Sequence, residues 1–145
     1  MTRAELTFLR KARIGYLATA DGTGEPSNVP FCYALDGTTL YSPLDEKPKS
    51  NDLARLKRIR NIRENPRVCV VVNHYDDDWS RLGHMIIRGR AKVMLRGSTH
   101  QTAVRLLRRK YPQYRRMAID QRPIIAIQLI RHITWGRIVH DRERR

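Results

Sequence analysis

The sequence predicts a mainly β domain of the α+β class, in which about six antiparallel strands form a closed or partly closed barrel with flanking helices. Two Asp-Gly turns, Asp21-Gly22 and Asp36-Gly37, separate short apolar runs, a pattern typical of antiparallel hairpins. Apolar and polar residues also alternate from Ile87 to Leu95, which predicts a long strand with one exposed face. The chain has 145 residues and no internal repeat, so residues 1–145 are expected to form a single domain.

The first third of the chain is predicted to be a short helix followed by an antiparallel meander. Residues 4–12 suit a helix that presents Leu6 and Leu9 on one face. The two Asp-Gly turns then divide three apolar runs, which are expected to be strands at residues 14–20, 27–35 and 38–42.

The middle of the chain is predicted to be a basic helix and a buried strand. Leucine or isoleucine recurs every three residues over residues 52–64, in an arc that also includes Arg60 and Arg63. Asn65-Pro66 ends this helix. The run at residues 67–75 is almost continuously apolar, which predicts a strand covered on both faces.

The remainder is predicted to contain two long strands separated by a helix. The first strand should divide its side chains between two faces, with Ile87, Gly89, Ala91, Val93 and Leu95 on one and Arg88, Arg90 and Lys92 on the other. Gly97-Ser98-Thr99 caps the helix, and Tyr111-Pro112 ends it. The second strand follows Pro123 and reaches Trp135.

The net charge of the chain predicts an anionic partner. Lys and Arg number 29 against 14 Asp and Glu, a formal charge of +15. Nucleic acid, an acidic membrane surface and a multiply charged small molecule are the candidates. An aromatic content of 7% and the lack of a helix-turn-helix, zinc-finger or RNP pattern argue against nucleic acid, which stays an alternative. No apolar run approaches the roughly 18 residues of a membrane helix, so a cytoplasmic protein without membrane contact is expected.

The chain lacks the sequence patterns of the common catalytic sites. It contains no G-x-S-x-G elbow, Walker loop or H-E-x-x-H motif, and its five histidines lack metal-ligand spacing, so no metal is expected. Cys32 and Cys69 lie in separate apolar runs, as buried reduced thiols do. A basic protein without an evident acid, base or nucleophile would depend on a cofactor for its chemistry.

One loop has the features of an anion site. Lys47 and Lys49 stand just before residues 50–52, any of which can cap the next helix. Two ammonium groups, unpaired backbone N–H groups and the positive end of the helix dipole would then meet, and a phosphate fits there. The alternative is that Pro48 only shapes a turn and the lysines only solvate it.

The order of elements and five motifs resemble a known family. The motifs are GYLATADGTGEPSNVPFCYALDGTTLY, DEKPKSNDLARLKRIRNIRENPRV, HYDDDWSRL, IIRGRAKV and KYPQY. Together they resemble the pyridoxamine 5′-phosphate oxidase-like split β-barrel proteins, and among these the probable coenzyme F420-dependent enzymes. The resemblance covers nearly the whole chain. It implies a six-stranded split barrel of the FMN-binding type and a homodimer with two cofactor sites at the interface, each bordered by both chains.

The resemblance also implies which residues contact the cofactor. They are Asn28, Val29 and Pro30 on the second strand, Tyr41, Ser42 and Pro43 at the end of the third, Lys47 and Lys49 in the loop, Arg60 and Asn61 on the helix, and Trp135 and Arg137 on the last strand. The second-strand residues should lie along the ring and the loop lysines should meet the phosphate. The last-strand pair should approach the ring or substrate from the partner subunit.

One segment departs from the family pattern. Gly83-His84-Met85 stands where the group usually has bulky aromatic residues, so the wall of the substrate pocket is expected to be reshaped there. Tyr33, His84 and ordered water are candidate proton donors. Trp79 and Trp135 have a purely structural alternative, as a plug against the barrel and as core at a strand end.

The charge also favours one cofactor over another. FMN and F420 share a tricyclic ring and a phosphate, but F420 adds a lactyl-oligoglutamate tail with several carboxylates, which an excess of positive charge suits. The sequence therefore favours hydride transfer from F420 to a small conjugated substrate. An FMN-dependent oxidase or reductase is the first alternative. A non-catalytic cofactor carrier and a basic nucleic-acid-binding protein are the others.

Overall fold

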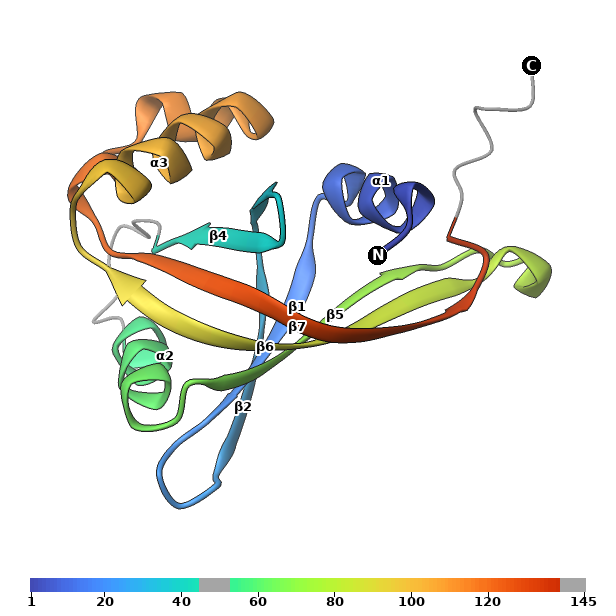
Figure 1. Cartoon of the computed structure of the whole chain (residues 1–145), viewed down its shortest axis with the longest axis horizontal. Coiled ribbons are helices and arrows are strands. Elements are labelled where there is room, and N and C mark those ends of the chain that lie inside the picture. The colour runs from blue at the N-terminus through green and yellow to red at the C-terminus, as the bar shows by residue number, and fades with distance from the viewer. Residues whose placement is uncertain (45–52, 139–145) are drawn as a thin grey trace.

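The computed structural model describes residues 1–44 and 53–138 and shows one twisted antiparallel sheet with three α-helices (Figure 1). The strands lie in the order β2-β1-β5-β6-β7-β4-β3. Their bounds are β1 Gly15–Ala20, β2 Pro26–Phe31, β3 Ala34–Asp36, β4 Thr39–Pro43, β5 Arg67–His74, β6 Gly83–Met94 and β7 Ile124–Gly136. The α-helices are α1 Arg3–Lys11, α2 Leu53–Glu64 and α3 Ser98–Lys110, and the 3-10 helices are η1 Trp79–Arg81, η2 Pro112–Arg116 and η3 Ile119–Gln121. The edge strands β2 and β3 do not pair within the described residues, so the barrel is not closed.

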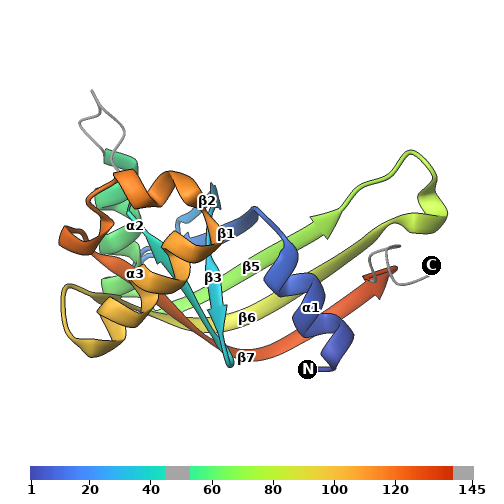
Figure 2. The same ribbon diagram turned by 90° about the horizontal axis from the view of Figure 1, so that it is seen from above.

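The long strands β6 and β7 run through the middle of the sheet, and the helices lie on either side of them. Figure 1 shows α1 and α3 on one side and α2 on the other. In Figure 2 the hairpin of β5 and β6 extends past α1, away from α2 and α3. None of the described helices is long and apolar enough to cross a membrane.

Two apolar cores hold the helices to the sheet. The main core joins Leu17, Val70 and Ile87, which are completely buried on the inner side of neighbouring strands, to Leu9 of α1 and Ile62 of α2. The second core lies under α3, and its members include Tyr41, Ala103, Val104, Leu107, Tyr114, Ile124 and Ala126. Because β4 and β7 alternate their side chains, each contributes to both cores.

The structure has seven strands where six were expected. The run predicted as one strand at residues 27–35 is divided into β2 and β3 around Tyr33. Side chains satisfy the Tyr33 backbone there: its N–H donates to the Tyr111 hydroxyl at 3.2 Å, and its carbonyl accepts from Lys110 Nζ at 2.9 Å. A backbone bonded in this way makes no ladder, so the prediction of a single strand was wrong.

The prediction that residues 67–75 would be covered on both faces was also wrong for the single chain. In β5 the buried residues Val68, Val70 and Val72 alternate with Cys69 and Val71, which are half-buried. Both cysteines of the chain are free thiols and half-buried.

The predicted faces of β6 are confirmed except at Leu95, whose place on the buried face was wrong. Ile87, Gly89 and Ala91 are buried, whereas Arg88 and Arg90 are exposed. Leu95 lies just past the end of the strand and is 61% exposed.

Candidate functional site

The candidate site is the outer face of the sheet, defined as the side of β2, β1, β5, β6 and β7 that points away from the main core. Register pairing aligns residues of neighbouring strands into rows, and alternate rows share a face. One outer row is Pro30, Tyr16, Val71, Ile86 and Ile133, which we call the apolar row. The next outer row is Asn28, Ala18, Cys69, Arg88 and Arg131. Tyr16 is 40% and Ile133 is 64% exposed, so the single chain leaves this face open.

An aromatic pair marks one end of the outer face. The rings of His84 and Trp135 stack with centroids 5.5 Å apart and planes at 22°. They face each other in the register of β6 and β7. Trp135 is 56% exposed, which excludes the interpretation that it belongs to the core.

Backbone geometry explains why glycines lie beside this pair. A Cβ at Gly83 would overlap the carbonyl of Arg137, and one at Gly136, whose φ is +73°, would overlap the carbonyl of Leu82. Close approach of the two strands therefore requires glycine at both positions. Met85 is completely buried in the main core, so only His84 of the Gly83-His84-Met85 segment borders the outer face.

Four arginines mark the other end of the outer face. Arg67, Arg88, Arg90 and Arg131 line a pocket of about 650 Å³, together with small or apolar residues of β1, β2 and β5 to β7. Arg67 lies opposite Arg90, and Arg88 lies opposite Arg131. A bulge between Arg88 and Gly89 places Ile130 as an extra residue of β7.

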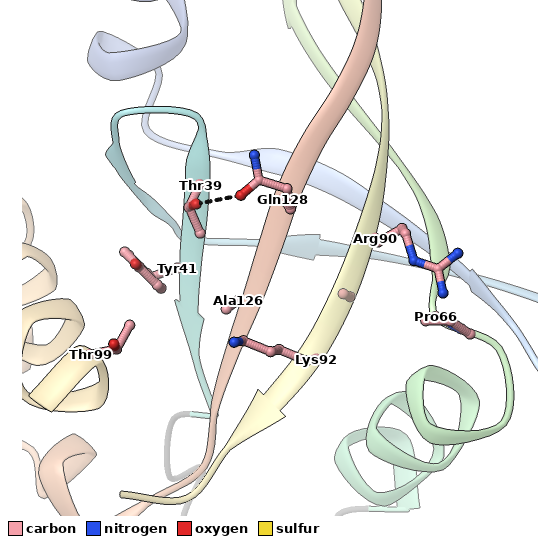
Figure 3. A pocket seen from close by; sticks show the side chains of 9 residues that line it. Thr39, Tyr41, Pro66, Arg90, Lys92, Thr99, Ala126 and Gln128 are labelled. Atoms are coloured by element: carbon pink, nitrogen blue, oxygen red, sulfur yellow. Dashed lines mark hydrogen bonds between the residues drawn. The ribbon is translucent and has the colours of Figure 1, made fainter. Parts of the chain in front are cut away.

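Arg90 also lines a second pocket, of about 420 Å³, at the edge of α3 (Figure 3). Tyr41, Lys92 and Thr39 are among its lining residues, and the Thr39 hydroxyl donates to Gln128 Oε1 at 3.0 Å. Burial raises the pKa of the Tyr41 hydroxyl, and the negative charge of the Asp36 carboxylate makes a smaller contribution in the same direction. The two pockets therefore adjoin along one basic strip of the sheet.

The structure brings some of the predicted cofactor residues to the outer face. Asn28 and Pro30 are exposed there on β2, whereas Val29 between them packs against the main core. A side-chain period of two makes this separation unavoidable. Trp135 lies on the same face at its far end, and Arg137, just past β7, is half-buried.

Other predicted residues lie elsewhere. Tyr41, Ser42 and Pro43 are buried at the end of β4, just before the part of the chain that the structure does not describe. Lys47 and Lys49 fall in that part, so their predicted phosphate contact lies outside the described residues.

The two predicted residues on α2 differ in their surroundings. Arg60 is exposed, whereas Asn61 is 2% exposed and donates to the Thr19 hydroxyl at 3.1 Å. Asn61 therefore links α2 to β1. Of the two side chains expected as candidate proton donors, Tyr33 is completely buried and donates to the carbonyl of Leu9 at 2.6 Å, whereas His84 borders the outer face.

Sequence reasoning missed Arg67 and Arg131 as site residues. Alternation in β6 indicated that Arg88 and Arg90 share a face, but their opposite arginines are distant in sequence. Only the strand register shows that the four residues form two pairs.

Comparisons with known proteins agree with this fold. The profile of the family described as "Pyridoxamine 5′-phosphate oxidase" matches residues 1–135. The chain is 36% identical over 75 residues to a 5a,11a-dehydrotetracycline/5a,11a-dehydrooxytetracycline reductase of Streptomyces rimosus subsp. rimosus, an alignment that covers 50% of this chain and 48% of that protein. The chain thus matches about half the length of this curated relative.

Solved structures share the fold at low sequence identity. An FAD-binding protein from Mesorhizobium loti aligns with a TM-score of 0.68 and 23% identity, covering 92% of this chain and 94% of that one. A heme-binding protein from Mycobacterium smegmatis aligns with a TM-score of 0.73 and 17% identity, covering 92% and 53%. The profile match over residues 1–135 shows that the chain belongs to the pyridoxamine 5′-phosphate oxidase family and has its split-barrel fold.

Proposed function

We propose that this protein is an oxidoreductase that binds a deazaflavin, coenzyme F420, on its outer face and reduces a small conjugated substrate. The single observation that carries the proposal is the composition of that face. An exposed apolar row suits a planar ring, and arginines two to four residues further along β5, β6 and β7 suit anionic groups of the same ligand. The relative named as a reductase supports two-electron reduction as the reaction class.

The described residues fit such a ligand. Pro30, Tyr16 and Ile86 would contact the ring, and the arginine pocket would hold anionic groups. The pocket lining contains four guanidiniums and no carboxylate among the described residues, which is the donor set that an anion requires. When bound, the cofactor would supply the hydride.

The protein's own part in the reaction is positioning and proton supply. The apolar row would exclude water from one side of the ring and hold the substrate against it. His84 is stacked on Trp135, which fixes its ring at the border of the outer face. In that position an imidazole can donate a proton to a reduced substrate.

A homodimer belongs to the same proposal. Tyr16, Ile133 and Trp135 form exposed apolar surface on one face, and covering it with a second copy would remove that surface from water. Asn28 and Trp135 lie in different rows on strands four positions apart, about 19 Å measured along the sheet at 4.8 Å per strand. A second copy would allow Trp135 of the partner to approach the ring beside Asn28.

Absorption and fluorescence titrations with F420, FMN and hemin test this proposal. We expect F420 to saturate at one per protomer with a lower Kd than FMN, on a protein that sediments as a dimer. FMN binding more tightly than F420 would make the protein an FMN-dependent oxidoreductase instead. Hemin binding in the absence of binding by both ring cofactors would refute the oxidoreductase proposal.

A further inference from the structure

We propose that the pocket lined by Arg67, Arg88, Arg90 and Arg131 is a subsite for a polyanion with two or more neighbouring carboxylate or phosphate groups. The inference deepens the proposed function and rests on it for the identity of the natural ligand, the anionic end of a cofactor. The binding chemistry itself follows from the pocket alone.

The first argument is the pairing of like charges. Arg67 and Arg90 are cross-strand partners, and so are Arg88 and Arg131. Like charges directly opposite each other in a sheet destabilise it, by roughly 0.2–1 kcal/mol on the scale of cross-strand pairs. Two such pairs lie side by side here, so the free protein carries a repulsion that a bound anion would remove.

The second argument is that the described residues supply no neutralising partner. The arginine–carboxylate pairs that they form involve Arg81 with Asp78 and Arg108 with Asp120, both away from this pocket. The other residues that line the pocket include Ala18, Ala20 and Ile130, which bear no charge. Within the described residues, none of the four guanidiniums is paired with a carboxylate.

The third argument is spacing. Arg88 and Arg90 are two residues apart along β6, about 6.7 Å, and the two pairs are offset by one strand, about 4.8 Å, so their centres lie roughly 8 Å apart. Each pair offers donors for one carboxylate or phosphate in bidentate geometry. Two successive anionic groups on one ligand match this arrangement better than a single anion does.

Closely spaced backbone forms the floor of the pocket. A Cβ at Gly89 would lie 2.7 Å from the carbonyl oxygen of Gln128, so the two strands approach closely beneath the arginines. The floor is thus backbone and small side chains, within a pocket of about 650 Å³.

The test is calorimetric titration of the full chain with tri-γ-glutamate and with tripolyphosphate, using monomeric glutamate and orthophosphate as single-group comparators. We expect both polyanions to bind at least about tenfold more tightly than their comparators. Tighter binding of tri-γ-glutamate identifies a carboxylate tail as the source, and tighter binding of tripolyphosphate identifies a phosphate chain. Equal binding of polyanions and comparators would overturn the two-group site.

Matched variants separate this pocket from the general positive field. Arg88→Gln and Arg131→Gln should each weaken polyanion binding by about tenfold or more, whereas Arg105→Gln, an exposed arginine of α3, should change it little. In the absence of anion, the pocket variants should raise the melting temperature by roughly 1–4 °C because a repulsive pair is removed. Equal losses of affinity in all three variants would overturn the proposal.

Two further outcomes refute the site, and one separates it from the proposed function. If Arg88→Gln dimerises more weakly than the wild type in the absence of added anion, the arginines bind carboxylates of a second copy rather than a ligand. Duplex DNA that binds more tightly than tripolyphosphate with the same variant dependence would assign them to nucleic acid. Polyanion binding without F420 or FMN binding would leave the subsite standing and refute the proposed function, and the reverse result would refute the subsite alone.

Discussion

Lys110 is the charged side chain whose burial should most visibly affect stability. Its ammonium group lies 4.2 Å from the centre of the Tyr33 ring and donates to the Tyr33 carbonyl at 2.9 Å. Burial, with a smaller contribution from the neighbouring Arg13 guanidinium, lowers the pKa of Lys110 from 10.5 to about 8. The folded protein therefore releases this proton more easily than the unfolded chain does.

The sign of the effect follows from proton counts. Between pH 8 and 10.5 the unfolded state holds more protons on this lysine than the folded state, so stability rises with pH in that window. Below pH 8 both states are protonated and the full destabilisation remains. From pH 7 to 9.5 the gain is at most about 2 kcal/mol, and partial access to solvent reduces it to about 1–2 kcal/mol.

The assay is urea unfolding at pH 7 and 9.5 under reducing conditions, for the wild type and for Lys110→Met. Methionine keeps the length of the side chain and removes the charge, so its stability should lack this gain between the two pH values. Lys57→Met, at an exposed position of α2, is the control and should follow the wild type. Above about pH 10 the trend should reverse, because burial raises the pKa of Tyr33 and raises that of Tyr111 to about 12. A wild type and Lys110→Met with parallel pH profiles would refute the reasoning.

Three further substitutions test other parts of the structure. Gly83→Ala places a Cβ against the backbone just after β7, so we expect a loss of about 1–3 kcal/mol in thermal unfolding, and an unchanged melting temperature would contradict the close approach. Asn61→Leu leaves the buried Thr19 hydroxyl without its donor, which should cost about 1–3 kcal/mol in urea unfolding; full stability would show that the bond contributes nothing. Lys49→Ala should weaken cofactor binding by about ten- to a hundredfold in an absorption titration. The control is Arg144→Ala, which removes the same charge from the arginine-rich tail, and an equal loss in both variants would contradict the predicted phosphate contact.

The parts of the fold that sequence predicted correctly are those decided by local pattern. The alternation in β6 needs only neighbouring residues, and the structure buries Ile87 while exposing Arg88. The turn at Asp21-Gly22 is also local, because Asp21 Oδ1 accepts from the backbone N–H of Thr23 at 2.8 Å. Such features can be read without knowing the topology.

The errors arose where residues distant in the sequence determine the local structure. The break at Tyr33 depends on Tyr111, which is 78 positions away, and no local signal announces it. The site has the same property, because Arg67 and Arg131 become neighbours of the β6 arginines only through strand register. For the ring contacts that the family resemblance implies at three consecutive residues, register adds which side chains share a face: Asn28 and Pro30 lie on the outer face and Val29 packs against the core.

The outer face also predicts a coupling between dimerisation and anion binding. A second copy packed on the outer face would bury half-buried Val71 and exposed Ile133. Strand β5 would then be covered on both faces, as its almost continuously apolar sequence predicts. The same face carries two arginine pairs on a chain of net charge +15, so two copies repel each other there. A bound polyanion would remove that repulsion. We therefore expect sedimentation equilibrium to show a dimer dissociation constant that falls by about tenfold or more when tripolyphosphate is added at constant ionic strength, with a smaller fall for Arg88→Gln. A dissociation constant that is independent of the anion would show that the arginine pocket lies away from the interface, so that the ligand and the second copy occupy separate parts of the sheet.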